Sequence, residues 1–209
     1  MRIKIDSNRM CRIIDPTMRG LRTYTPEFAG METGDRALDI CCGTGSQVLQ
    51  YARMGIIADG IDLDPRMIKV AETNRKKQSL TNVSFQTANA LNLPFEDSFF
   101  DYASISMALH EKERADRDSI ISEMKRVLKE EGALVFIDYK VPLPRIPSSY
   151  LSVALEYISG RDHWRCFQDY TEQGGLDGLL KKNNLHEEKR DELGPLWIII
   201  TRNLRGVNQ

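Results

Sequence analysis

A glycine turn and an acidic residue about twenty positions after it are the features of this sequence best suited to bind a ligand. Residues 37–41 are mostly apolar and predict a short buried strand, which ends near Gly43 and Gly45, and helical spacing begins at Ser46. Glycine adopts positive φ without strain and lets a ligand approach the backbone. The N-terminus of the following helix then offers unpaired amide donors to a polar or anionic group.

Asp62 completes the pattern, because it ends a second apolar segment, 56–61. A carboxylate at this distance from a glycine turn can accept hydrogen bonds from two ribose hydroxyl groups. The combination favours an adenosine-containing ligand over the alternative, a plain strand-to-helix turn. The third glycine of the dinucleotide fingerprint is absent, since Gln47 and Val48 stand where it would fall, so NAD is less favoured.

Two segments resemble the first and second motifs of class I S-adenosylmethionine-dependent methyltransferases. They are Leu38-Asp39-Ile40-Cys41-Cys42-Gly43-Thr44-Gly45 and Gly60-Ile61-Asp62-Leu63-Asp64-Pro65-Arg66-Met67. The resemblance covers nearly the whole chain and is closest to the ubiquinone/menaquinone-biosynthesis group (methyltransferase type 11), with further matches at Leu93-Pro94-Phe95-Glu96-Asp97 and Lys125-Arg126-Val127-Leu128-Lys129. Cys42, and Glu130-Glu131-Gly132 in place of Pro-Gly-Gly, depart from the family pattern. Cys42 alters little, because the glycines of the first motif remain, and the second departure concerns only a turn.

The resemblance implies a set of residues that bind S-adenosyl-L-methionine. These are Asp39, Cys41, Gly43, Thr44, Gly45, Asp62, Leu63, Asn89, Ala90 and Ser106. Asn89 replaces the Asp of many members, and either side chain can hydrogen-bond the adenine amino group. Asp39 would orient the methionine amino group. The alternative role for Asp39 is that of a strand-end carboxylate that caps local amides. A carboxylate inside an apolar strand is costly unless it is paired, which favours the functional role.

Methyl transfer from a sulfonium demands mainly in-line positioning in a dry pocket, and a base only where the acceptor must lose a proton. His110, four residues after Ser106, is the first candidate for that base and is expected at the rim above the fourth strand. His163 is the second candidate. A lone histidine is more often a satisfied surface or core residue. The sequence predicts no metal site.

Strand and helix patterns alternate five times up to Tyr139 and predict an α/β fold with a parallel sheet. Helical spacing at 120–128 is expected to end at Glu131-Gly132, and residues 133–139 read as the fifth strand. The resemblance implies a Rossmann-like class I methyltransferase fold. That fold has a seven-stranded, mostly parallel sheet with an antiparallel last strand and helices on both faces.

The chain is expected to form a single methyltransferase domain, 1–209, with two segments that shape the acceptor site. Residues 1–36 would be an N-terminal cap of short helices, in which Tyr24 and Phe28 could line the pocket or pack in the core. Residues 142–169, interrupted by prolines and rich in aromatic residues, would be a lid-like insertion with one helix near 148–159. A further helix is expected at about 171–183, followed by strands at 187–193 and 196–201.

Composition narrows the function classes. The chain has 209 residues, 41% of them hydrophobic and 28% charged, with a net charge of -1, which disfavours a nucleic-acid partner. No segment reaches transmembrane length, and the four cysteines show neither a CxxC pair nor metal-ligand spacing, so a cytoplasmic protein is expected.

The leading prediction is a methyltransferase that acts on a small-molecule, aromatic or quinol-like acceptor. An NAD-dependent oxidoreductase and a non-catalytic S-adenosylmethionine-binding module are the alternatives. Carbon, oxygen and nitrogen stay open as the methylated atom.

Overall fold

The computed structural model describes residues 18–203, which form seven strands, seven α-helices and one 3-10 helix. The helices are α2 (Arg19–Ala29), α3 (Ser46–Arg53), α4 (Pro65–Lys77), the 3-10 helix η1 (Leu109–Glu111), α5 (Arg114–Val127), α6 (Pro147–Ser159), α7 (Arg161–Glu172) and α8 (Gly175–Lys182). The strands are β1 (Arg36–Ile40), β2 (Ile57–Asp62), β3 (Val83–Thr87), β4 (Phe100–Ser106), β5 (Leu128–Tyr139), β6 (Glu187–Leu193) and β7 (Leu196–Arg202).

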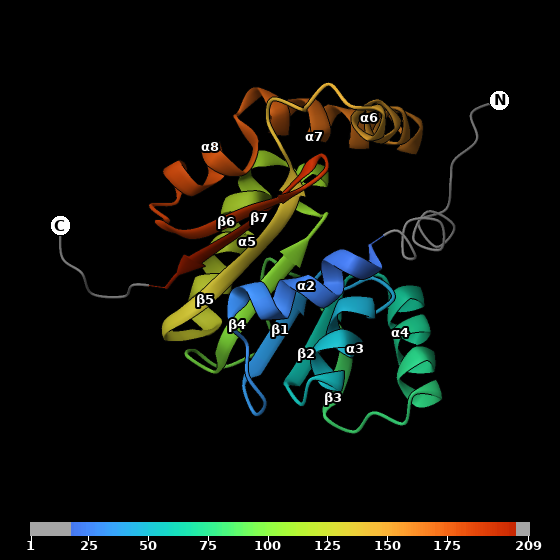
Figure 1. Ribbon diagram of the computed structural model, residues 1–209, viewed down its shortest axis with the longest axis vertical. Coiled ribbons are helices and arrows are strands. Elements are labelled where there is room, and N and C mark those ends of the chain that lie inside the picture. The colour runs from blue at the N-terminus through green and yellow to red at the C-terminus, as the bar shows by residue number, and fades with distance from the viewer. Residues whose placement is uncertain (1–17, 204–209) are drawn as a thin grey trace.

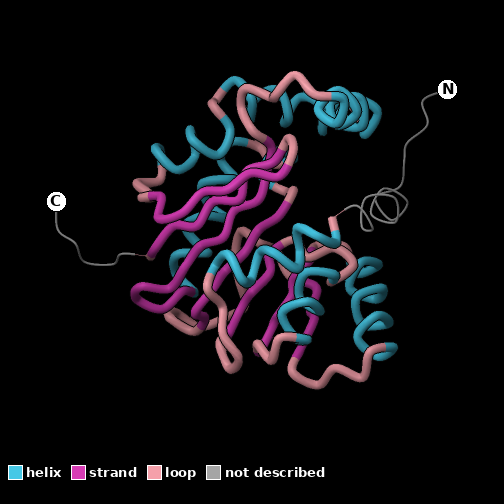
Figure 2. Tube along the Cα trace, in the orientation of Figure 1, coloured by secondary structure: helices cyan, strands magenta, loops and turns pink. Residues whose placement is uncertain are grey.

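One twisted sheet contains all seven strands, in the order β3-β2-β1-β4-β5-β7-β6 (Figure 2). The neighbours among the first five strands pair in parallel, and β7 pairs antiparallel with both β5 and β6. The predicted seven-stranded sheet with an antiparallel last strand is confirmed. The chain order reverses direction between β1 and β4, which is where an open parallel sheet leaves a crevice for a ligand.

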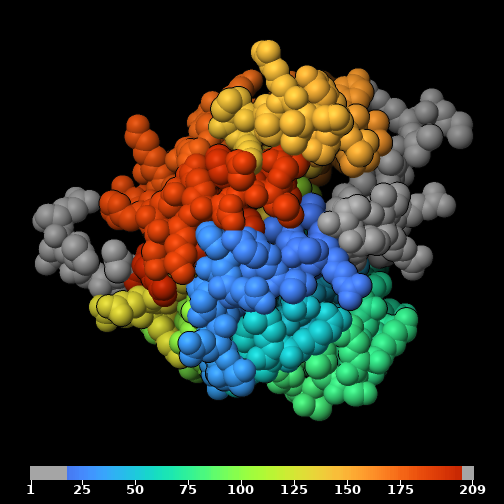
Figure 3. Space-filling model, in the orientation of Figure 1, coloured from blue at the N-terminus to red at the C-terminus, as the bar shows by residue number. Residues whose placement is uncertain are grey.

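Helices cover both faces of the sheet (Figure 1). On one face, Val48, Leu49 and Tyr51 of α3 pack in a core with β1, β2 and β3. On the other face, Met124 of α5 and Leu180 of α8 join a larger core with β4 and β5. Strands between two helical layers bury both faces, and β1, β4 and β5 are accordingly buried over most of their length, whereas the edge strand β6 is charged and mostly exposed. Figure 3 shows α2 between α3 and the β6–β7 pair.

The end of α5 differs from the sequence-based expectation. The helix ends at Val127, not at Glu131-Gly132, and β5 begins at once with Leu128. Asn203 explains the early end, because its Nδ2 donates to the carbonyl oxygens of Lys125 (3.0 Å), Leu128 (3.2 Å) and Lys129 (3.1 Å). These oxygens therefore have a partner without another helical turn.

Residues 142–169 form more helix than the sequence indicates. Two helices, α6 and α7, meet at Gly160, whose φ of 133° is open to glycine alone. α7 continues to Glu172, so the next helix, α8, begins at Gly175 and not near Thr171. Figure 1 shows α6 and α7 beyond the carboxyl end of β5.

Several expectations for the N-terminal segment fall on residues 1–17, which lie outside the described part of the chain, as does Cys11. Within the described part of residues 1–36, α2 precedes β1. Tyr24 stacks on Phe28 with ring centroids 5.4 Å apart, and its hydroxyl donates to Asp191. Phe28 packs against the core. No helix between residues 18 and 203 is long and apolar enough to cross a membrane.

Candidate functional site

The turn between β1 and α3 has the conformation that its glycines allow. Gly43 and Gly45 have φ values of 53° and 76°, and Cys41 also has a positive φ of 59°. A side chain on Gly45 would place its Cβ 2.5 Å from Cζ of Phe85 and 2.8 Å from Cβ of Ala71. The lack of a side chain at Gly45 therefore lets α3 begin close against β3 and α4. It also allows Gly45 to adopt its positive φ without strain.

Asp62, the last residue of β2, holds this turn in place. Its Oδ2 accepts a hydrogen bond from the Gly43 amide at 2.9 Å, and its Oδ1 accepts one from the Asp64 amide at 2.9 Å. Asp64 caps α4 by accepting from the Arg66 amide at 2.8 Å, as its position before Pro65 predicts. The carboxylate of Asp62 thus lies at the carboxyl edge of the sheet, between the glycine turn and the start of α4.

Two cavities meet at this edge. The larger has a volume of about 320 Å³ and the smaller about 160 Å³, and both are lined by Cys41, Asp62, Leu63 and Lys112. Their combined size falls in the range of small-molecule sites, about 300–1,000 Å³. The larger cavity is also lined by Met18, Leu21, Arg22, Asp39, Cys42, Gly43, Thr44, Ser46, Gln47, Asp64, Met67, Ser106, Met107, Ala108 and Glu111. The smaller is also lined by Ile61, Ala88, Asn89, Ala90, Leu91, Asp116 and Ile120.

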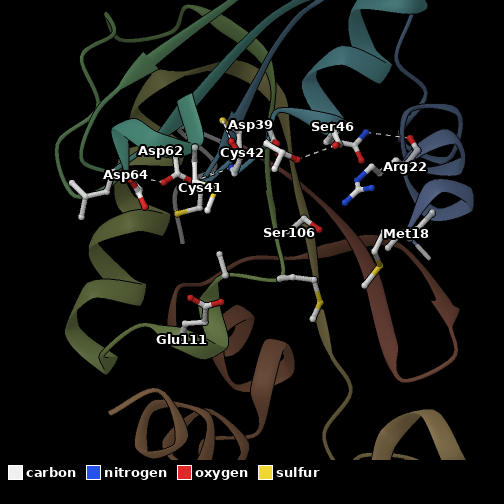
Figure 4. Close-up of a pocket in the computed structure, with 18 of the residues that line it drawn as sticks. Met18, Arg22, Asp39, Cys41, Cys42, Ser46, Asp62, Asp64, Ser106 and Glu111 are labelled. Atoms are coloured by element: carbon white, nitrogen blue, oxygen red, sulfur yellow. Dashed lines mark hydrogen bonds between the residues drawn. The ribbon is translucent and has the colours of Figure 1, made fainter. Parts of the chain in front are cut away.

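The structure brings nearly all of the predicted binding residues together. Of the ten predicted residues, every one except Gly45 lines at least one of the two cavities. Figure 4 shows Met18 and Arg22 on the α2 side of the larger cavity, Asp62 and Asp64 on the opposite side, and Glu111 reaching it from η1. The sequence-based reasoning missed Arg22 and Lys112. Arg22 gave only a weak signal, as one of several basic residues near the N-terminus.

Asp39 is a buried carboxylate on the wall of the larger cavity. Its side chain lies inside β1, where Ser104 Oγ donates a hydrogen bond of 2.7 Å to Oδ1. Burial raises the pKa of Asp39 to about 7, while the Ser104 hydrogen bond and the positive charge of Arg22 oppose the shift. A cationic ligand group beside Asp39 would favour its ionised form. The residue can therefore receive an ammonium group.

The cysteines near the turn have the character of small apolar residues. Burial raises the pKa of Cys41 to about 12 and that of Cys42 well above its usual value. A thiol with such a pKa is protonated at neutral pH and is a poor nucleophile. Cys166, on α7, is also a free thiol.

His110 does not lie at the rim where the sequence placed it. The side chain is 2% exposed and lines neither cavity. Its Nδ1 contacts Oδ1 of Asp138 at 2.6 Å, and Oδ2 of Asp138 accepts from the backbone amides of Leu109 (3.1 Å) and His110 (3.2 Å). The expected position is wrong because Asp138, on β5, draws the ring under α6 and α7.

Glu156 on α6 connects His110 to His163. Its Oε1 lies 3.5 Å from His110 Nε2, and its Oε2 contacts Nε2 of His163 on α7. Burial opposes protonation of His110, but the carboxylates of Asp138 and Glu156 outweigh it and raise the pKa of His110 well above its usual value. A general base must lie within hydrogen-bond reach of the acceptor, and His110 is buried and lines neither cavity, so this geometry does not support its predicted base role.

Comparison with known proteins agrees with this site. Residues 37–132, which contain β1 to the start of β5, match the family described as "Methyltransferase domain". The chain is 33% identical over 124 residues to a demethylmenaquinone methyltransferase of a Geobacillus species, covering 58% of this chain and 52% of the relative. It is 34% identical over 128 residues to the ubiquinone/menaquinone biosynthesis C-methyltransferase UbiE of Pectobacterium carotovorum, covering 58% of this chain and 49% of the relative. The chain thus spans about half the length of the curated relatives it matches.

A solved structure shows the same fold over almost the whole chain. The crystal structure of a SAM-dependent methyltransferase from Aquifex aeolicus superposes with a TM-score of 0.71 at 18% identity, covering 96% of this chain and 100% of that one. At this identity the likeness concerns the fold. The family match over 37–132, the two relatives and the shared fold agree with the glycine turn and the acid after β2. Residues 37–132 therefore match a methyltransferase domain, and almost the whole chain shares the fold of the Aquifex aeolicus protein.

Proposed function

We propose that this chain binds S-adenosyl-L-methionine across the two joined cavities and transfers its methyl group to a small-molecule acceptor. One observation carries the proposal: Asp62 presents its carboxylate where the two cavities meet, held there by amides of the glycine turn and of Asp64. A carboxylate at this position of an α/β sheet accepts hydrogen bonds from ribose hydroxyl groups.

The lining residues fit the other parts of the cofactor. The smaller cavity, with Asn89, Ala90 and the 68%-exposed Leu63, suits the adenine ring. Asn89 Oδ1 accepts from the Leu91 amide at 3.0 Å, which fixes the orientation of its side chain. The larger cavity pairs Asp39 with Arg22 on its wall, and this pair would receive the ammonium and the carboxylate of the methionine portion.

Bound S-adenosyl-L-methionine supplies a sulfonium methyl group that is already electrophilic. What the chain must supply is position and a dry environment, and positioning alone can contribute about 7–11 kcal/mol. Met18, Leu21 and Met107 give the larger cavity apolar walls that would limit water. Neither His110 nor His163 acts as a proton acceptor in this mechanism.

The names of the two relatives suggest the first acceptors to test, which are quinol-like aromatic compounds. Aromatic residues of the 142–169 segment support this class, since Trp164 stacks on Phe167 with ring centroids 5.6 Å apart and Tyr157 packs edge-on against Trp164. We propose that this segment covers the acceptor site as a lid and that α2, from the described part of residues 1–36, closes it from the N-terminal side, within a single domain. Phe167 is buried, so these rings also fix the segment to the core.

Calorimetry with S-adenosylhomocysteine and with NAD tests the cofactor assignment. We expect one molecule of S-adenosylhomocysteine per chain and no measurable binding of NAD. A screen of hydroquinones and naphthoquinols, monitored by release of S-adenosylhomocysteine, then tests the activity. A protein that binds S-adenosylhomocysteine but methylates no acceptor would be a non-catalytic binding module, contrary to the proposal.

A further inference from the structure

A second group of potential ligand atoms lies next to the cofactor cavity. Ligand atoms of His110, Glu111 and His163 all lie within 4.8 Å of one another. His110 and Glu111 belong to η1, which follows β4, whereas His163 comes from α7. Because the three residues come from two segments about 50 positions apart in the chain, the sequence offered no metal-binding motif and predicted no metal site.

Asp138 orients His110 in the way that outer carboxylates orient metal-bound histidines. The 2.6 Å contact between Asp138 and Nδ1 fixes the ring so that Nε2 faces Glu156 and Glu111. A histidine ligand almost always donates its other ring N–H to a carboxylate, a backbone carbonyl or water, which raises its basicity toward the ion. The same arrangement is present here around a side chain that is 2% exposed.

Glu156 adds a fourth ligand group between the two histidines. Its Oε1 is 3.5 Å from His110 Nε2 and its Oε2 contacts His163 Nε2. The hydroxyl of Tyr139 donates to Oε1 at 2.8 Å and holds the carboxylate in place. Two imidazole nitrogens therefore face one buried carboxylate, with the more exposed carboxylate of Glu111 beside them.

We propose that His110, Glu111 and His163, together with Glu156, bind one divalent transition-metal ion such as Zn²⁺. Ligand atoms about 2.0–2.1 Å from a tetrahedral Zn²⁺ lie about 3.4 Å apart, close to the spacing of His110 Nε2 and Glu156 Oε1. The carboxylate of Glu111, 4.0 Å from His110 Nε2, is 39% exposed and can approach by side-chain rotation. A set of two nitrogens and two carboxylates suits Zn²⁺, Fe²⁺ and Mn²⁺ better than Ca²⁺ or Mg²⁺.

The ion would have an access route and a defined position. Glu111 lines the larger cavity and His163 is 22% exposed, so an ion can enter past these two side chains. Bound there, it would join η1 to α6 and α7 at the edge of the cavity. Because a cation that binds only the folded chain stabilises it by mass action, metal should also raise the unfolding temperature.

Equilibrium dialysis and calorimetry of the chelator-treated full chain with Zn²⁺, Mn²⁺ and Co²⁺ test the site. We expect one equivalent of Zn²⁺ and a higher unfolding temperature with metal. Asp138→Asn removes an outer-shell partner and should weaken metal binding by about 10- to 100-fold. His163→Ala removes a ligand itself and should weaken metal binding by more than that. His163 is partly exposed, so its variant should fold.

His186→Ala is the matched control, because His186 is the third histidine of the chain and lies exposed before β6. Its variant should bind metal as the original chain does. The proposal is overturned if the chelator-treated chain binds none of the three ions, or if His163→Ala and His186→Ala weaken binding equally. Neither result depends on S-adenosylhomocysteine binding, which should persist in His163→Ala, so the two proposals fail separately.

Discussion

Two neighbouring regions of this molecule hold their acidic groups in opposite ways. At the ends of β1 and β2, Asp39 and Asp62 line a cavity, where Asp39 accepts from the Ser104 hydroxyl and Asp62 from the amides of Gly43 and Asp64. Under α6 and α7, Asp138 and Glu156 are closed against two histidines. The first region presents its carboxylates to a cavity, whereas the second pairs its carboxylates with histidines of the same chain, around the position proposed for the metal ion. Substitutions in the first should therefore change cofactor binding, and substitutions in the second should change metal binding and stability but not cofactor binding.

The largest effect is expected for Asp62→Ala on cofactor binding. Two charge-assisted hydrogen bonds to ribose, at about 1.5–3 kcal/mol each, would be lost, which is about a 100-fold or larger drop in affinity. Calorimetry with S-adenosylhomocysteine measures the drop. Asp59→Ala is the matched control, since Asp59 lies on the same strand, hydrogen-bonds Ser84 and lines neither cavity, so the affinity of its variant should change little. Equal affinities for both variants would remove Asp62 from the binding site.

Glu156→Gln should have the opposite profile, with a large loss of stability and unchanged binding of S-adenosylhomocysteine. Removing one partner from a buried ion pair costs about 3–5 kcal/mol, because the remaining charge stays buried without compensation. Urea unfolding in the presence of a chelator measures the loss. Glu113→Gln is the control, since Glu113 pairs with Arg165 on the surface and exposed pairs contribute about 0–1 kcal/mol. Equal unfolding midpoints for the two variants would contradict a stabilising buried ion-pair network around Glu156.

The contrast also explains how far the sequence could predict the structure. The positions of the glycine turn and of Asp62 could be predicted, because they follow from local conformation and from the place where a strand ends. The surroundings of His110 were not, since Asp138 is 28 residues away and Glu156 lies on a different helix. The end of α5 was missed for the same reason, because the side-chain amide that caps it belongs to Asn203, which follows β7 and lies 78 residues after Lys125 in the chain. Contacts of this kind depend on the tertiary fold and leave no periodic signal in the sequence.

Gly45→Ala tests whether the turn needs glycine here for close packing as well as for its positive φ, because Gly30 offers a control with nearly the same φ. Gly30 and Gly45 have φ values of 75° and 76°, but a Cβ on Gly30 meets nothing within 4 Å, while one on Gly45 meets Phe85 and Ala71. Gly30→Ala should cost about 1–2 kcal/mol from the left-handed conformation alone. Gly45→Ala should cost about 1–3 kcal/mol more from overpacking. Urea unfolding of both variants gives the difference, and equal losses would mean that Gly45 is required only for its φ.

The smallest expected effect is a pH dependence of cofactor binding that arises from Asp39. The pKa of Asp39 is about 7 in the folded chain, well above the ordinary value of 3.8, so at mildly acidic pH the folded chain holds a proton that the unfolded chain has released. Its contribution to stability is therefore largest below about pH 4 and is lost as the pH rises through 7.

The affinity for the cofactor should change with pH in the other direction. An ammonium group favours the ionised carboxylate, so affinity for S-adenosylhomocysteine should rise with pH, by at most about tenfold per unit below pH 7, and level off above it. Calorimetry in two buffers of different ionisation enthalpy should show proton release on binding near pH 6 and little near pH 8. In Asp39→Asn the affinity should be lower and its rise through pH 7 should disappear, along with the proton release. If the original chain binds S-adenosylhomocysteine equally well across this range, Asp39 does not face the ammonium group, and the methionine portion must lie elsewhere in the cavity.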